Sequence, residues 1–169
     1  MGILELIQQK AFLGRVFLTW LWFRAEGDPV FQLPGKHRCE IEILGPLVLD
    51  ANYGDARSTA LQGDSPATSP EAATALREGK KLRRARLKIS SDGVDWVAGI
   101  DGETLSISGL HLPRPGQFSF EELLRLRLGF MLEFETIFSE LFDAFLEIRL
   151  DDKTWGAEIE KIQDWVRNK

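Results

Sequence analysis

Apolar residues recur at helical spacing near both ends of this sequence. From Ile3 to about Arg24 they follow one another at intervals close to 3.6 residues, which predicts a long N-terminal helix. A second helix is predicted from Ser119 to about Leu150, because Ser119 and Glu122 have the spacing of a capping box and the apolar periodicity continues after them. A final helix is predicted after Asp152.

The predicted helix at 119–150 carries two apolar stripes side by side. The first stripe consists of Leu123, Leu126, Phe130, Phe134, Ile137, Leu141, Phe145 and Ile148. The second consists of Phe120, Leu124, Leu128, Met131, Phe138, Phe142 and Leu146. One domain core ordinarily covers one face of a helix, so the second stripe is expected to pack on the N-terminal helix or on another copy of the chain.

Strand patterns lie between the two helical regions. Apolar and acidic residues alternate at 39–51, which predicts a half-buried strand, and the Gly45-Pro46 pair within it indicates a bulge or a sheet edge. A weaker strand is predicted at 55–62. A short helix is predicted at Pro70–Glu78, because a Ser-Pro pair opens it and a glycine follows it.

Three further strands are predicted at 82–89, 94–100 and 104–110. Asp-Gly pairs at 92–93 and 101–102 join them, and Asp-Gly between alternating runs is a strong signal for a β-hairpin. The prediction is therefore a single α+β domain over residues 1–169. In it, an antiparallel sheet of about five strands packs against a long N-terminal helix and a C-terminal helical layer.

Composition agrees with a globular chain: 44% of the 169 residues are hydrophobic and 28% are charged. The single cysteine, Cys39, has no partner for an internal disulfide, and with two histidines it supplies too few ligands for a structural zinc site. A reducing cytoplasm fits this composition best. No cofactor is expected.

The apolar run at 11–23 invites a membrane interpretation. It spans only 13 residues and contains Arg15, whereas a membrane-spanning helix needs about 20 apolar residues. A buried helix is therefore expected, with an interfacial or partner-binding helix as the alternative. No membrane association is expected.

Signatures of enzymes are missing from the sequence, which contains no HExxH, GxSxG or CxxC motif. Asp92, Asp95, Asp101 and Glu103 lie close together in the sequence and could surround a divalent metal ion, as in an enzyme that uses these carboxylates. The backbone geometry of the Asp-Gly turns explains two of the four equally well. A nucleophilic pair of His37 and Cys39 would lack a third group to orient the histidine.

The most unusual stretch is the basic segment at 77–88. It holds seven basic residues and one acidic residue, a local charge of +6, whereas the whole chain has a net charge of −5. In a strand, Arg84, Arg86 and Lys88 share one face, about 7 Å apart, and that spacing lets successive cations follow a phosphate backbone. The alternative is that they project into water and pair with acidic residues of adjacent strands.

Tryptophan is common in the sequence. Its five tryptophans are Trp20, Trp22, Trp96, Trp155 and Trp165. All of them stand in apolar periodic settings, which favours core packing over the stacking of nucleic-acid bases.

Three segments together carry a resemblance to a known family. They are FLGRVFLTWLWFRAEGD, ALREGKKLRRARLKI, and FMLEFETIFSELFDAFLEIRL followed by IEKIQDWV. In this order they resemble the C-terminal region of bacterial recombination-associated proteins of the RdgC type. The resemblance implies sequence-tolerant DNA binding and modulation of a RecA-type recombinase, without enzymatic turnover.

The family's N-terminal portion, with which its ring-forming architecture is associated, has no counterpart in this sequence. Either a companion subunit supplies that portion, or the chain has lost the DNA role.

The leading hypothesis is a non-enzymatic, DNA-associated accessory protein of recombination or replication in the cytoplasm, at the nucleoid. It would bind the phosphate backbone weakly and without sequence specificity. The residues expected to touch phosphates are Lys80, Lys81, Arg83, Arg84, Arg86 and Lys88. The alternative is a protein-protein interaction or assembly module that uses an apolar helical face, for example a homodimer through the helix at 119–150. In that case the basic segment is only solvated.

Overall fold

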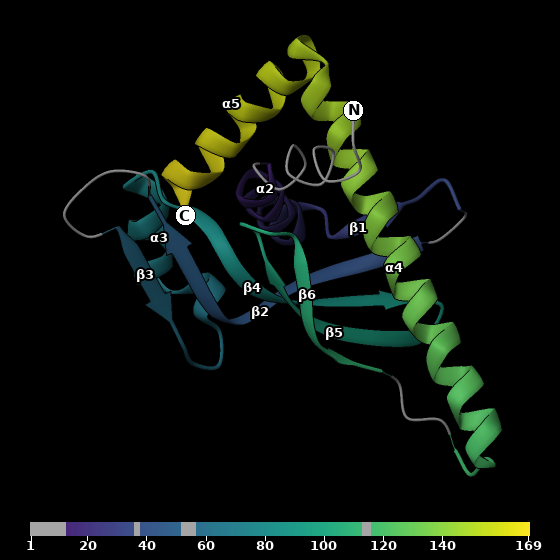
Figure 1. Ribbon diagram of the computed structural model, residues 1–169. Coiled ribbons are helices and arrows are strands. Elements are labelled where there is room, and N and C mark those ends of the chain that lie inside the picture. Colours follow the sequence, from purple (N-terminus) through teal and green to yellow (C-terminus); the bar gives the residue numbers. More distant parts are fainter. Residues whose placement is uncertain (1–12, 36–37, 52–56, 113–115) are drawn as a thin grey trace.

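The computed structural model describes residues 13–35, 38–51, 57–112 and 116–169. Its helices and strands are shown in Figure 1. In chain order they are α2 (Gly14–Gly27), β1 (Val30–Gln32), β2 (Arg38–Asp50), β3 (Ser58–Leu61), the 3-10 turn η1 (Pro66–Thr68), α3 (Pro70–Arg77), β4 (Lys81–Ser91), β5 (Val94–Asp101), β6 (Ser106–His111), α4 (Phe120–Leu150) and α5 (Asp152–Asn168).

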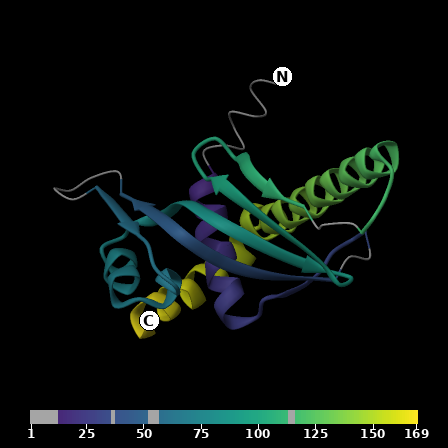
Figure 2. The same ribbon diagram turned by 90° about the horizontal axis from the view of Figure 1, so that it is seen from below.

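The described strands form one antiparallel sheet in the order β1-β2-β4-β5-β6, and β3 pairs with the far end of β2. Helices α2, α4 and α5 lie on one side of this sheet (Figure 1). Seen from below, the strands pass in front of α2, and none of these helices covers them (Figure 2). This side of the sheet is called the open face below. The predicted α+β class, with its N-terminal helix and C-terminal helical layer, is confirmed.

Helix α2 forms the centre of the core. Phe17, Leu18, Trp20, Leu21 and Trp22 are at most 1% exposed. The helix is apolar nearly all round, so it must be covered on several sides, and the sheet and the C-terminal helices cover it. The expectation of a buried helix at 11–23 is confirmed for the described part from residue 13 onward, and residues 1–12 lie outside the described ranges.

No described helix combines the length and the apolar character needed to cross a membrane.

The start of α2 packs directly on the loop between β5 and β6. A Cβ atom added to Gly14 would lie 2.1 Å from the carbonyl oxygen of Gly102, so the two backbones touch. This contact corrects the predicted hairpin at 101–102. The connection is a longer loop over residues 102–105, because Asp101 still belongs to β5 and Gly102 packs under the helix.

Other elements follow the predictions closely. The two-residue turn of Asp92 and Gly93 joins β4 to β5 with φ angles of 50° and 78°, as expected of an Asp-Gly hairpin. The pairing of β2 with β4 is irregular near Gly45-Pro46, as predicted. Strand β1 was not predicted, because a run of three residues is too short to show an alternating pattern.

Helix α4 begins with the predicted capping box, since Ser119 accepts the Glu122 N–H and Glu122 accepts the Ser119 N–H. The two halves of the helix differ. Phe138, Phe142 and Phe145 pack their rings on Phe17 of α2 at centroid distances of 4.9–5.8 Å. The first half projects beyond the body (Figure 1).

Helix α5 is held to α2 through two carboxylates, of which Glu158 is buried and Glu26 is exposed. The Nε1 atoms of Trp22 and Trp165 donate to Glu26 at 2.7 and 2.8 Å. Glu158 accepts from Nε1 of Trp20 at 3.0 Å. These bonds satisfy the indole N–H groups. Trp20 and Trp22 lie in the core, as their apolar settings predicted, and Trp165 is partly buried against it.

Candidate functional site

Strand β4 carries most of the basic segment. Its side chains alternate as predicted, with Ala85 and Leu87 buried in the core and Arg84, Arg86 and Lys88 on the open face of the sheet. Three of the predicted phosphate ligands therefore lie together on the open face.

A bulge interrupts the alternation at Arg83. Val48 of β2 is opposite Arg84 and Leu49 is opposite Leu82, so Arg83 is an extra residue on the β4 side. Bulges re-aim a side chain relative to the regular pleat. Here the bulge gives Arg83 a set of contacts different from those of its neighbours.

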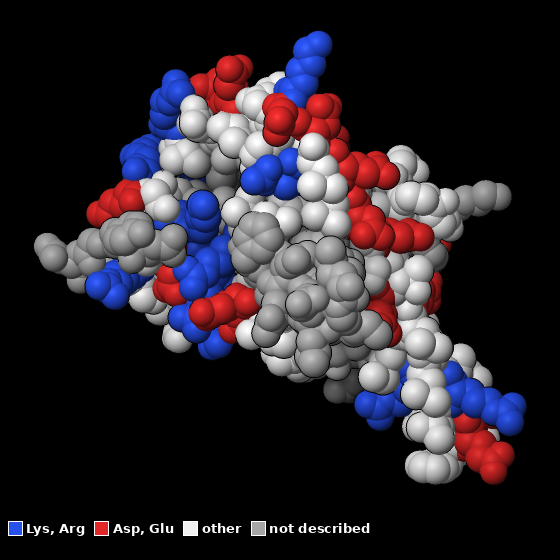
Figure 3. All heavy atoms as spheres, turned by 45° about the horizontal axis from the view of Figure 1, so that its top comes forward, with Lys and Arg blue, Asp and Glu red and all other residues white. Residues whose placement is uncertain are grey.

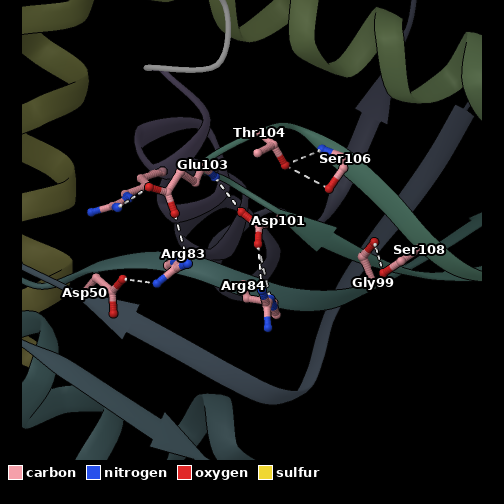
Figure 4. A network of polar contacts seen from close by, with 10 residues as sticks. Asp50, Arg83, Arg84, Gly99, Asp101, Glu103, Thr104, Ser106 and Ser108 are labelled. Atoms are coloured by element: carbon pink, nitrogen blue, oxygen red, sulfur yellow. Dashed lines mark hydrogen bonds and ion pairs between the residues drawn. The ribbon is translucent and has the colours of Figure 1, made fainter. Parts of the chain in front are cut away.

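Arg83 lies between two carboxylates. Its Nη1 atom is 2.9 Å from Oδ2 of Asp50, and its Nη2 atom is 2.9 Å from Oε2 of Glu103 (Figure 4). Glu103 also pairs with Arg15 of α2 at 3.6 Å. The hydrogen bond to Asp50 is the main cause of the raised pKa of Arg83. This network ties β4 to β2 and α2, which is a structural role.

Arg84 donates two hydrogen bonds to Oδ2 of Asp101, at 2.8 and 3.3 Å (Figure 4). Burial opposes ionisation of Asp101, but the bonds from Arg84 and from the Glu103 N–H outweigh it and hold the pKa of Asp101 below its usual value. Arg84 is therefore neutralised by the adjacent strand.

Two lysines of the segment, Lys80 and Lys88, also have acidic partners. Lys80 is only 6% exposed, and its Nζ atom contacts Thr59 at 2.8 Å and Glu78 at 3.0 Å. Lys88 lies 3.8 Å from Glu42 on β2 and 3.6 Å from Asp95 on β5.

Four of the six predicted phosphate ligands thus have acidic partners. Lys81 and Arg86 form no ion pair within the described part of the chain, and both are exposed. Such pairing is the arrangement expected of a solvated strand face.

The carboxylates considered for a metal ion are also engaged. Asp95, Asp101 and Glu103 all form ion pairs with lysine or arginine, and Asp92 occupies the hairpin turn. Among the described residues, no group of three or more His, Cys, Asp or Glu side chains could hold a metal ion.

The Cys39 thiol is held in its protonated form. Burial, with a contribution from the charge of Glu140, raises its pKa to about 11. A thiol with such a pKa is a poor nucleophile at neutral pH. His37, its hypothetical partner, lies outside the described residues.

Six of the eight large apolar side chains that are exposed in the described chain lie at 118–132, at the start of α4. Phe120 is 79% exposed, Leu132 is 64% exposed, and the other members are close to half exposed. The exposed face of α4, as the term is used below, comprises Phe118, Phe120, Leu124, Leu128, Met131 and Leu132.

Charged residues of both signs flank this face. They are Glu121, Arg125, Arg127 and Glu135, all exposed and without an ion pair in the described part of the chain. The projecting half of α4 is visible at the lower right of Figure 3, where basic and acidic residues lie beside uncharged ones. The sequence predicted the second stripe of α4, but it gave no signal that only its C-terminal half would be covered.

No protein family, curated protein or solved structure matches this chain significantly.

Proposed function

We propose that this chain is a non-enzymatic assembly module that forms a homodimer through the exposed face of α4. The observation that carries this proposal is the apolar row on a helix that projects from the body. Single exposed apolar residues are common on protein surfaces, whereas a contiguous row of them is typical of an interaction site.

The size of the face supports a dimer. A whole aromatic side chain has an area of about 150–250 Å², and leucine and methionine have somewhat less. Since the six side chains are 47–79% exposed, they offer together roughly 600 Å² per copy. Two copies would bury roughly 1,200 Å², which is the lower limit of a stable interface.

Charge supports a second copy as the occupant. The charged residues on the side of the helix that carries the apolar row are two acidic and two basic ones and sum to zero, whereas Glu122 and Glu133 lie on the opposite side by helical periodicity. Two copies can therefore approach along this face without net repulsion. A symmetric dimer uses the same patch on both subunits, and a projecting helix is accessible for such pairing.

The test is the double variant Leu124→Glu/Leu128→Glu, studied by sedimentation equilibrium at high micromolar concentration. We expect a dimer for the wild type and a monomer for the variant, because four buried carboxylates per dimer would lack partners. The matched control is Thr136→Glu/Ser139→Glu, which adds the same charge at exposed positions of α4 outside the face. A monomeric wild type, or a dimeric Leu124→Glu/Leu128→Glu variant, contradicts the proposal.

Weak, sequence-independent DNA binding is the second candidate function. Lys81 and Arg86 support it, because both are exposed and form no ion pair with any acid that the structure describes. The resemblance to the RdgC type supports it as well, and it would place the chain at the nucleoid with a recombinase or a companion subunit. The ion pairs of the other four cations weaken this candidate, because each pair must be broken before a phosphate can bind.

Salt dependence tests this second candidate. With two phosphate contacts, the logarithm of affinity for duplex DNA falls with the logarithm of salt concentration at a slope of about −1.8. Contacts from three or four cations would give about −2.7 to −3.6. We expect a dissociation constant no tighter than the ~10⁻⁴ to 10⁻⁶ M of non-specific binding.

Fluorescence anisotropy on a labelled duplex is the measurement. The double variant Lys81→Gln/Arg86→Gln should abolish binding, and the control Arg84→Gln, whose charge is already paired, should bind nearly as well as the wild type. No binding by the wild type even near 20 mM salt would exclude this candidate.

A further inference from the structure

A groove of about 540 Å³ lies on the open face of the sheet, over β4, β5 and β6. None of its lining residues belongs to the exposed face of α4, and the assembly function does not use it. Its wall includes the side chains of Pro46, Arg84, Arg86, Asp101, Ser108 and His111.

The floor of the groove lies at Gly99, where no side chain fills the space above the backbone. In the sheet, Arg86 of β4 is opposite Gly99 of β5, which in turn is opposite Ser108 of β6. A Cβ atom at Gly99 would lie 2.9 Å from the Ser108 Oγ atom. The glycine therefore leaves a hollow between an arginine on one side and a serine hydroxyl on the other.

A bulge in β6 turns His111 toward the same groove. Ser108 pairs with Gly99 and His111 pairs with Val97, so β6 has one residue more than β5 between these two pairs. Gly109 takes up the extra residue with a φ of 57°, a conformation that glycine adopts without strain. As a result Leu110 packs against the core and His111 lines the groove.

The groove has an uncompensated positive charge. Among the described residues, Asp101 is the only acid in the wall, and its carboxylate already accepts two bonds from Arg84 and one from the Glu103 N–H. Arg86 is paired with Leu44 and Gly99, and the acids diagonal to it, Glu42 and Asp101, already form ion pairs with Lys88 and Arg84. Of the three cations on this face of β4, Arg86 is the one whose donors are not used within the described chain.

We propose that this groove binds a small oxyanion, the phosphate group of a soluble phosphate compound, with Arg86 as its charged ligand. The planar guanidinium group presents paired N–H donors that match two phosphate oxygens. The Ser108 hydroxyl supplies a further donor from the opposite wall. Its present bond to the Gly99 carbonyl is long, at 3.4 Å, and is readily exchanged for a phosphate oxygen.

Phosphate titration of the ¹⁵N-labelled protein tests this proposal, with sodium chloride at matched ionic strength as the reference. We expect saturable shifts of the Gly99, Ser108 and Gly109 amide signals with phosphate. Arg86→Gln should weaken phosphate binding at least tenfold. The matched control is Lys81→Gln, which removes the other acid-free cation outside the groove and should leave phosphate binding unchanged.

A second variant tests the hollow without changing the charge. Gly99→Ala places a methyl group against Ser108 and should also weaken phosphate binding, and the same spectra show that the variant is folded. Shifts that do not saturate, or that sodium chloride reproduces, overturn the proposal, as does unchanged affinity in Arg86→Gln. The dimer-blocking variant Leu124→Glu/Leu128→Glu should bind phosphate normally, so failure of the assembly function and failure of this site are distinguishable.

Discussion

Strand β4 and the first half of α4 differ in what the rest of the chain provides for them. On β4, Arg83, Arg84 and Lys88 each meet a carboxylate from another part of the sheet. On α4, Phe120 and Leu132 remain mostly in water. The basic segment is the more unusual one in the sequence, but the apolar segment is the one left without partners among the described residues.

The difference has a simple physical cause. One acidic side chain on a neighbouring strand suffices to pair a cation, and a sheet offers two neighbouring strands. An apolar helix face needs a whole second element to cover it, and α4 extends farther than the body beneath it (Figure 1). A conspicuous charge is thus weaker evidence for a binding site than a conspicuous uncovered apolar face.

The largest expected effect separates the two halves of α4. Phe145 is fully buried against Phe17 and Trp20, so Phe145→Ala should lower the free energy of unfolding by about 3–5 kcal/mol. Phe120→Ala should change the stability of the monomer by no more than about 0.5 kcal/mol. Urea denaturation at low protein concentration measures both. A large loss in Phe120→Ala would mean that the chain itself covers this side chain.

A smaller effect separates paired from unpaired cations on β4. Arg83→Met keeps the apolar stem but leaves the Asp50 side chain, only 10% exposed, without its charged donor. We expect a loss of about 1–3 kcal/mol. Arg86→Met, the matched control, should stay within about 0.5 kcal/mol of the wild type. Equal losses in the two variants would show that the Arg83 network contributes no stability of its own.

Removal of the α4 cap should cost less. Ser119→Ala removes the acceptor for the Glu122 N–H and should lower the free energy of unfolding by about 1 kcal/mol, as measured in thermal melts. Ser139→Ala, at an exposed position inside the same helix, should be neutral or slightly stabilising. An unchanged melting temperature in Ser119→Ala would indicate that the projecting half of α4 unfolds separately from the body.

The smallest effect depends on pH and tests the Arg84–Asp101 pair. The pKa of Asp101 is lowered from 3.8 in the folded protein, so its contribution is present above that value and is lost as pH falls through the folded pKa. Arg84 is 57% exposed, and solvent screening limits the contribution to about 0.2–1 kcal/mol. Asp101→Asn should therefore be less stable than the wild type at neutral pH.

The two proteins should converge in stability in urea melts at acid pH, where Asp101 is protonated in both the folded and the unfolded state. A difference that stays constant from neutral to acid pH would show that the charge of Asp101 is not the cause.

Features set by local chemistry could be predicted from the sequence. The capping box of α4, the serine cap of α3 and the Asp92-Gly93 turn depend on residues within one turn of each other, and all three are present. The class of the fold followed from the periods of the apolar residues.

Features set by tertiary contacts could not be predicted. The register of β4 on β5, which places Arg84 opposite Asp101, follows from the two-residue turn, but nothing local indicates which residues of β2 lie beside β4 and pair Arg83 with Asp50 and Lys88 with Glu42. The bulge at Arg83 and the long loop after Asp101 arise from packing against β2 and α2. The uncovered half of α4 depends on the length of the helix relative to the body, which periodicity does not report.

The contact between Gly14 and Gly102 also limits how this sequence can vary. A methyl group at either position would meet backbone atoms of the other segment, and backbone atoms cannot turn aside as a side chain does. In a saturation mutagenesis library selected for folding, both positions should therefore tolerate almost no replacement, whereas exposed Gly27 and Gly116 should accept many. A single added carbon atom at position 14 would lift α2 from the sheet and move Phe17 and Trp20 with it, so these two glycines set the thickness of the core.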